Sequence, residues 1–254
     1  MSAFAITGSG SGIGAAVRRR LESSGARVIG VDLRGAEVEA DLGTLDGRIE
    51  AVRGVLDLAD RRLDGVVACA GIGPHVTDGP AIVSVNFFGA VAVLDGLRDA
   101  LAATRGAAVA VSSNSAMIPT SDNEIAAACL AGDETAARTL AAEVAGQLAY
   151  GGSKLALARW VRRHATGPAW ASAGIRLNAV APGAVRTPLL QGGLDHPVLG
   201  DAIRSFPIPS GGFGTADQIA AAIVFLLGPD AAFCCGSVLF VDGGTDALFR
   251  PERV

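Results

Sequence analysis

The chain is short of the residues that metal centres, disulfide frameworks and nucleic-acid surfaces require. Its 254 residues include four cysteines, at positions 69, 129, 234 and 235, and three scattered histidines, and neither set has a metal-ligand or secreted-disulfide spacing. Charged residues make up only 18% of the sequence and the net charge is −4, so no basic surface for nucleic acid is expected. This composition gives no support to metal catalysis or to nucleic-acid binding.

Long apolar runs are missing as well, although the mean hydropathy is high at +0.42. That value comes from alanine, glycine and valine, and no window of about 18 apolar residues is free of a charge or a turn signal. The first predicted strand starts at Ala3, which leaves no room for a signal peptide. We therefore expect a cytoplasmic protein that does not bind a membrane.

No linker rich in proline or serine divides the chain, in which predicted strands and helices alternate. Strands are expected near 3–7, 27–32, 37–41, 64–69, 107–113, 174–180 and 237–241, and helices from about 12, 44, 79, 148 and 215. This alternation predicts a single α/β domain over residues 1–254, a Rossmann-type doubly wound parallel sheet with helices on both faces. Right-handed crossovers place the loops after the strands at one edge of such a sheet, where ligands bind.

The turn after the first predicted strand is rich in glycine. Gly8, Gly12 and Gly14 separate the apolar run 3–7 from a helical pattern, an order typical of a nucleotide-binding unit. Glycine lets the backbone approach a diphosphate closely, and the first amides of the following helix are unpaired donors at a positive dipole end. Asp32 ends the next strand, 18 residues after Gly14, where a carboxylate accepts hydrogen bonds from ribose hydroxyls and repels a 2′-phosphate.

Tyr150, the single tyrosine of the chain, is followed four residues later by Lys154, so the two side chains are expected one turn apart on one helical face. A phenol has a pKa near ~10, and a base at neutral pH needs a pKa lower by roughly 3 units. A neighbouring cation acts in that direction because it favours the phenolate. The same spacing also occurs by chance on exposed helices. The glycine-rich turn near the N-terminus is the observation that favours interpreting Tyr150 and Lys154 as an acid/base pair.

Taken together, the motifs resemble those of the short-chain dehydrogenase/reductase family over essentially the whole chain. Thr7–Gly14 is similar to the family's cofactor turn, and Asp41-Leu42 resembles its adenine-contacting position. Ala68-Cys69-Ala70-Gly71 stands where the family usually has Asn-Asn-Ala-Gly, so only the last two residues match. Asn178–Thr187 and Val241–Gly244 resemble the motifs beside the nicotinamide and on the last strand. The resemblance implies hydride transfer between a nicotinamide cofactor and an alcohol or ketone.

The resemblance also implies roles for individual residues. The catalytic residues are Asn86, Ser113, Tyr150 and Lys154. Tyr150 would exchange the proton of the substrate oxygen, Ser113 would orient that oxygen, and Lys154 would lower the pKa of Tyr150 and hold the nicotinamide ribose. Asn86 would support a water that links Lys154 to solvent. The expected cofactor-binding residues are Gly8, Ser11, Gly12, Ile13, Gly14, Asp32, Arg34, Asp41, Leu42, Ala70, Gly71, Tyr150, Lys154, Pro182, Gly183, Val185 and Thr187.

The cofactor is expected to be NAD, with NADP less favoured. Asp32 would repel a 2′-phosphate, and Ser11 stands before Gly12 where relatives that bind this phosphate often carry a basic residue. Arg34 could fold toward the 2′ position and weaken the preference.

Thirty-six residues separate Ser113 from Tyr150, more than most family members have. The extra segment, about 120–148, is rich in alanine and charge and reads as added helix. With Asp32–Arg34, Cys69–Gly71 and Thr187–Gln191, it resembles the bacterial 3α-hydroxysteroid dehydrogenase/carbonyl reductase subgroup, which implies a homodimer more readily than a homotetramer. The alternative interpretation is that the extra segment is a mobile surface excursion.

Residues from about 186 to 214 are apolar and punctuated by proline and glycine, as in a lid over a ligand. Few charges are present to bind a carboxylate or phosphate, so an apolar alcohol or ketone is favoured, such as a 3α-hydroxysteroid, a terpenoid or a xenobiotic carbonyl. The same side chains also suit packing against the core or another subunit. The alternatives are a dehydrogenase of non-steroid alcohols, an epimerase or dehydratase of related type, and a catalytically silent NAD-binding regulator.

Overall fold

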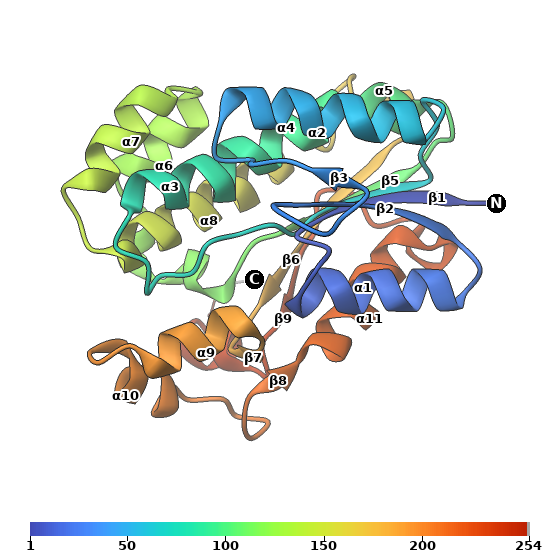
Figure 1. Cartoon of the computed structure of the whole chain (residues 1–254). Helices are drawn as coiled ribbons and strands as arrows, with labels where there is room; N and C mark the ends of the chain where they lie inside the picture. Colours follow the sequence, from blue (N-terminus) through green and yellow to red (C-terminus); the bar gives the residue numbers. More distant parts are fainter. Residues whose placement is uncertain (253–254) are drawn as a thin grey trace.

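A parallel sheet of seven strands lies at the centre of the computed structural model, which describes residues 1–252 (Figure 1). The strands lie across the sheet in the order β3-β2-β1-β4-β5-β6-β9. Their bounds are Ala3–Thr7 (β1), Arg27–Asp32 (β2), Val38–Glu39 (β3), Gly65–Ala68 (β4), Ala107–Val111 (β5), Arg176–Pro182 (β6) and Val238–Val241 (β9). The order changes direction between β1 and β4, which confirms the Rossmann-type fold and locates its ligand-binding crevice.

Helices cover both faces of this sheet. Helices α1 (Gly12–Ser23) and α11 (Ala216–Leu227) lie side by side on one face, and α2 (Leu45–Leu58), α4 (Ala90–Gly96) and α8 (Gly146–His164) cover the other (Figure 1). Shorter helices complete the chain: α3 (Gly79–Val83), α5 (Arg98–Ala102), α12 (Thr245–Phe249), a π-helical turn η1 (Ser84–Gly89), and 3₁₀ turns η2 (Asn114–Met117), η3 (Pro119–Ser121), η4 (Ala171–Ala173) and η5 (Pro229–Ala231). The predicted helix starts are within two residues of the observed ones.

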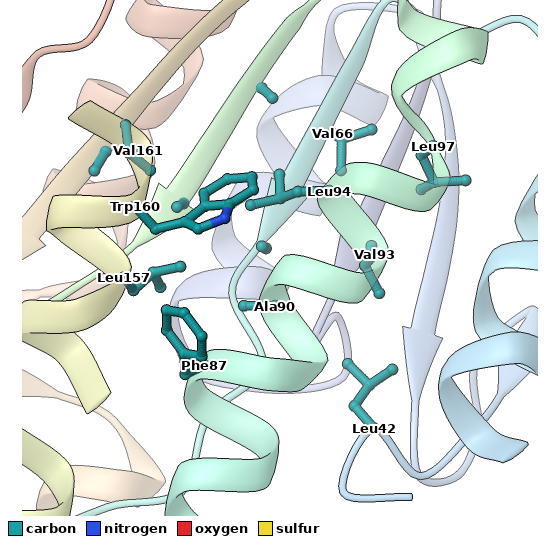
Figure 2. Close-up of a cluster of buried hydrophobic side chains, with 14 of the residues drawn as sticks. Leu42, Val66, Phe87, Ala90, Val93, Leu94, Leu97, Leu157, Trp160 and Val161 are labelled. Atoms are coloured by element: carbon teal, nitrogen blue, oxygen red, sulfur yellow. The ribbon is translucent and has the colours of Figure 1, made fainter. Parts of the chain in front are cut away.

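The central strands are apolar because helices cover both faces of the sheet. Strand β5 reads Ala-Ala-Val-Ala-Val and is buried along its whole length, as a parallel strand between two helical layers must be. On the α4 and α8 side, Trp160 and Leu157 point toward Phe87 and Leu94 within one apolar cluster (Figure 2). This packing fixes α8, the helix that carries Tyr150, against the sheet.

The stretch Gly79–Gly96 is long and apolar enough to span a membrane, but 56% of it is buried inside the fold, as in an ordinary core helix.

Strand β3 is shorter than the predicted strand 37–41. After Glu39 the chain leaves the sheet, because the Asp41 carboxylate accepts a hydrogen bond from the Gly43 amide at 2.8 Å and closes a turn. This turn leads into α2, whose N-cap is Thr44. The loop from Ala40 to Thr44 therefore stands at the carboxyl edge of the sheet.

The added segment forms two helices, α6 (Glu124–Ala131) and α7 (Glu134–Ala142), that pack on α8 and α3 (Figure 1). Their contact with α8 depends on two glycines directly after Tyr150. A Cβ on Gly151 would lie 2.2 Å from Ser121 Oγ, and one on Gly152 would lie 2.6 Å from Asn123 Oδ1. A side chain at either position would require Ser121 or Asn123 to move from its place against α8.

The second excursion leaves the sheet after β6. It contains β7 (Val185–Arg186), α9 (Pro188–Asp195), α10 (Leu199–Arg204) and β8 (Gly214–Thr215), and β7 pairs with β8 in a small separate sheet. Figure 1 places this lid segment beyond the carboxyl edge of the large sheet, next to the start of α1.

Candidate active site

The glycine turn holds the start of α1 close to the ends of β1 and β4. Gly8 and Gly12 have positive φ angles of 69° and 51°, which favour glycine. A Cβ on Gly14 would lie 2.1 Å from the Gly8 carbonyl oxygen, so this close approach excludes every other residue. Ser11, the N-cap, makes no side-chain cap hydrogen bond. The first amides of α1 are thus directed at the crevice, where an anionic diphosphate fits.

A cavity of about 640 Å³ begins at this turn and extends across the edge of the sheet. Its volume lies in the range of small-molecule and cofactor sites. The cavity gathers nearly all the residues that the sequence motifs pointed to. Those that line it are Gly8, Ser11, Gly12, Ile13, Gly14, Asp32, Asp41, Leu42, Ala70, Gly71, Ser113, Tyr150, Lys154, Pro182, Gly183, Val185 and Thr187.

Two of the predicted residues are not in the lining. Arg34 is exposed on the loop after β2, and the structure does not bring it to the cavity. Asn86 is fully buried behind the wall, in the π-helical turn η1. Its amide binds the backbone of Ile72 in both directions, with Oδ1 accepting from Ile72 N at 2.8 Å and Nδ2 donating to Ile72 O at 3.0 Å. Asn86 thus fixes the loop after β4, and its support of a water remains a prediction.

Asp32 is oriented by the glycine turn. Its Oδ2 accepts a hydrogen bond from Gly10 N at 2.9 Å and its Oδ1 accepts one from Leu33 N at 2.8 Å. The carboxylate is therefore held at the end of β2, with accepting capacity left for hydroxyl groups inside the cavity.

Ser113, Tyr150 and Lys154 meet where α8 crosses the end of β5. The Ser112 hydroxyl donates to the Lys154 carbonyl at 2.8 Å, and Lys154 Nζ donates to the Val111 carbonyl at 2.8 Å, so two bonds tie the helix to the strand. Lys154 Nζ lies 5.9 Å from the centre of the Tyr150 ring. The three side chains thus come from two rigid elements and face one cavity.

Burial dominates the ionisation of this group. It lowers the pKa of Lys154 to about 8, with the Cys69 thiol acting in the opposite direction. Burial also raises the pKa of Tyr150, and the Ser113 hydroxyl opposes that rise. The ammonium is directed at the Val111 carbonyl and not at the phenol, and burial sets the direction of the Tyr150 pKa shift in the chain alone, so a lowering of that pKa by Lys154 stays a prediction.

Cys69 occupies the position where the family pattern has asparagine. Burial raises the pKa of its thiol to about 11, so the side chain is neutral. Just beyond the backbone pairing of β1 and β4, Thr7 Oγ1 accepts hydrogen bonds from Cys69 N and Ala70 N, both at 3.0 Å. The hydroxyl of β1 thus keeps the two strand ends together.

Several lining residues carried no signal in the sequence. Arg138 comes from the inserted helix α7, and Asp78, Ala81 and Val85 come from α3 and η1. Their place in the wall depends on how distant helices pack, and no short motif encodes that. Leu189 and Leu190 of α9 also line the cavity and belong to the predicted lid.

Comparisons with known proteins agree with this geometry. The family model described as short chain dehydrogenase matches residues 2–147, and that described as Enoyl-(Acyl carrier protein) reductase matches residues 144–246. The chain belongs to the short-chain dehydrogenase/reductase family. It is accordingly an oxidoreductase that acts on hydroxyl groups with a nicotinamide cofactor.

Within this short-chain dehydrogenase/reductase family, the similar proteins include full-length matches. The 3-alpha-hydroxysteroid dehydrogenase/carbonyl reductase of Comamonas testosteroni is 44% identical over 258 residues, covering 100% of both chains. The crystal structure of the 3-alpha-hydroxysteroid dehydrogenase from Pseudomonas sp. B-0831 complexed with NADH matches at 48% identity with a TM-score of 0.97, again over 100% of both chains. The D-threitol dehydrogenase of Mycolicibacterium smegmatis is 29% identical, covering 94% of this chain and 90% of that protein.

Proposed function

We propose that this protein interconverts secondary alcohols and ketones of apolar compounds with NAD(H), and that 3α-hydroxysteroids and other carbonyl compounds are its substrates. The observation that carries the proposal is the meeting of Ser113, Tyr150 and Lys154 in the cavity that begins at the amides of α1. The full-length likeness to the Comamonas and Pseudomonas proteins supports the steroid class.

The residues of the chain divide the reaction between them. A bound nicotinamide accepts a hydride from carbon in oxidation and returns it in reduction. Tyr150 takes the hydroxyl proton in oxidation and donates a proton to the carbonyl oxygen in reduction. The Ser113 hydroxyl binds that oxygen and orients it. Lys154, with a pKa of about 8, is mainly cationic at neutral pH and stabilises negative charge on the oxygens nearby.

NAD is the favoured cofactor because of the charge at the end of β2. A 2′-phosphate there would meet the Asp32 carboxylate, whose orientation is fixed by the Gly10 and Leu33 amides. Arg34, the cation that would soften this repulsion, is outside the cavity. Ribose hydroxyls, in contrast, are donors that match a carboxylate.

The lid supplies the apolar part of the substrate site. Pro188, Leu189 and Leu190 at the start of α9 line the same cavity as Tyr150, and Ile72 lies in the wall as well. An alcohol with a large hydrocarbon body buries apolar surface against these side chains.

The test is NADH formation at alkaline pH with a panel of 3α-hydroxysteroids and simple secondary alcohols, with the Tyr150→Phe variant alongside. We expect steroid turnover in the wild type and turnover slower by about 10²- to 10⁴-fold in the variant. Turnover of other alcohols alone would refute the steroid and keep the dehydrogenase. NAD binding without turnover of any compound would favour a catalytically silent NAD-binding protein.

The proposed assembly is a homodimer formed through the β9 edge. Phe225 on α11, Phe233 after η5, Leu239 on β9 and Leu248 on α12 are large, exposed apolar side chains. Strand β9 also ends the sheet, and a second copy would cover its edge and these side chains together. Light scattering should give a dimer for the wild type and a monomer for Phe225→Glu, and equal masses would contradict this interface.

A cytoplasmic location is part of the proposal, because Cys69, Cys129, Cys234 and Cys235 are all free thiols, which suits a reducing compartment. Cell fractionation with an antibody to the protein tests it, and recovery outside the cytoplasm would contradict it.

A further inference from the structure

The inserted helix α7 reaches the loop that follows β3. This loop, residues 40–44, lines the cavity at the edge strand of the sheet, on the side away from Tyr150 and Lys154. A dinucleotide with its diphosphate at α1 and its nicotinamide at Tyr150 has its adenosine over β2 and β3. On the proposed function, residues 40–44 thus form the adenosine end of the site.

Arg48, in the first turns of α2, holds this loop from behind. Its side chain is only 8% exposed. Nε donates to the Leu42 carbonyl at 2.8 Å, and Nη2 donates to the Gly43 carbonyl at 3.4 Å and to the Ser84 carbonyl at 3.1 Å. One guanidinium therefore binds the cavity loop and the π-helical turn at the same time.

The counter-ion of this buried cation comes from the insertion. Glu134, the first residue of α7, pairs with Arg48 through two bonds, Nη1 to Oε2 at 2.6 Å and Nη2 to Oε1 at 2.7 Å. The Ser84 hydroxyl also donates to Glu134 Oε1 at 2.8 Å. Within residues 1–252, no other carboxylate forms an ion pair with Arg48. A buried guanidinium without its counter-ion is costly, so Glu134 fixes where Arg48 lies.

The network continues to the cavity wall. Arg138, one turn after Glu134, donates from Nη1 to the Ser84 hydroxyl at 2.6 Å and itself lines the cavity. Helix α7 thus contacts the cofactor site at two places, through Arg138 directly and through Glu134 and Arg48 indirectly.

We propose that Glu134 is a positioning residue for the adenosine half of the cofactor, and that the insertion sets cofactor affinity through the Glu134–Arg48 pair. Without the carboxylate, Arg48 keeps only carbonyl partners and no longer fixes the Leu42–Gly43 backbone in one place. Cofactor binding then has to order this loop at a cost in affinity. The chemical step is unaffected because Ser113, Tyr150 and Lys154 are held by β5 and α8.

The test compares Glu134→Gln with Glu143→Gln, an exposed glutamate of the same insertion that forms no ion pair within residues 1–252. Calorimetry measures the dissociation constant of ADP-ribose, which carries the adenosine and diphosphate without the nicotinamide. Steady-state kinetics measure kcat and the KM values of NAD and of the alcohol. In Glu134→Gln we expect the ADP-ribose dissociation constant and the KM of NAD to rise about tenfold, with kcat and the KM of the alcohol unchanged. The Glu143→Gln protein should match the wild type.

A double-mutant cycle tests whether Glu134 acts through Arg48. Because Glu134 acts through Arg48, Arg48→Lys combined with Glu134→Gln should weaken ADP-ribose binding less than the sum of the two single changes. Should Glu134→Gln fail to fold, Glu134→Asp keeps the charge but draws it back from Arg48, and a smaller loss of ADP-ribose affinity is then expected.

Wild-type ADP-ribose affinity in a folded Glu134 variant would overturn this proposal alone. An equal loss in Glu143→Gln, or a fall in kcat at unchanged cofactor affinity, would overturn it too. A wild-type protein that binds neither ADP-ribose nor NAD would overturn the proposed function and this proposal with it.

Discussion

Lys154 is the only lysine in the sequence and is only 4% exposed, so its ionisation can be followed through stability. Burial lowers its pKa from 10.5 to about 8. In the folded chain its one hydrogen-bond acceptor is the Val111 carbonyl, and it forms no ion pair among residues 1–252. Keeping Lys154 charged in the folded protein therefore lowers the free energy of unfolding.

The sign and size of that cost follow from the two pKa values. Between pH 8 and 10.5 the unfolded chain binds more protons at this lysine than the folded chain, so the free energy of unfolding rises with pH in that window. The interval is roughly 2.5 pH units, and at 1.36 kcal/mol for each unit it corresponds to about 3 kcal/mol. The destabilisation is fully present below pH 8 and is relieved above 10.5.

Urea unfolding of the wild type and of Lys154→Met at pH 7 and pH 10.5 measures this effect. Methionine keeps the unbranched apolar chain and removes the charge. We expect the stability of the wild type, relative to the variant, to rise by up to about 3 kcal/mol between the two pH values. Arg159→Met is the control, since this half-buried arginine of α8 stays charged throughout and its difference should be flat. A flat difference for Lys154→Met as well would refute the reasoning from burial.

Other expectations concern the cofactor and the proton. Tyr150→Phe should lower kcat by about 10²- to 10⁴-fold, the usual contribution of a general acid/base, and should leave the NAD dissociation constant measured by fluorescence nearly unchanged. Asp32→Ala should loosen the preference for NAD over NADP, and an identical ratio of kcat/KM for the two cofactors would count against Asp32 as the selector. Gly14→Ala places a methyl group 2.1 Å from the Gly8 carbonyl, so we expect a loss of about 1–3 kcal/mol in unfolding free energy and loss of NAD binding, and a stable variant that binds NAD would contradict the role of that close approach.

The parts of the fold that the sequence predicted are those encoded locally. Strands such as β1 and β5 are continuous apolar runs, and the turn at Gly8 to Gly14 needs glycine for steric reasons, so both can be recognised without a structure. The order of the motifs then places Asp32, Ser113 and Tyr150 at one edge, because parallel strands end on the same side of a sheet.

The remaining features depend on contacts between distant segments. The π-helical turn around Asn86 exists because its side chain binds the backbone of Ile72, and the shortening of β3 follows from the turn at Asp41. Arg138 enters the cavity wall only through the packing of α7. The upward shift of the Tyr150 pKa in the chain alone also could not be predicted from its spacing to Lys154, because it comes from the burial of the phenol.

Gly151 and Gly152 lie in α8 between Tyr150 and Lys154, where the segment 120–148 packs on the helix. The residue types that α8 can carry at these two positions therefore depend on that segment. Each glycine costs roughly 1 kcal/mol in a helix interior relative to alanine, and each leaves room for Ser121 or Asn123 to lie against α8 in its present rotamer. A change in α8 at these positions therefore requires an adjustment of the covering segment. A relative that lacks the segment is free to carry larger residues at these positions, and we expect residues 120–148 transplanted into such a relative to pack better when both glycines are transplanted with them.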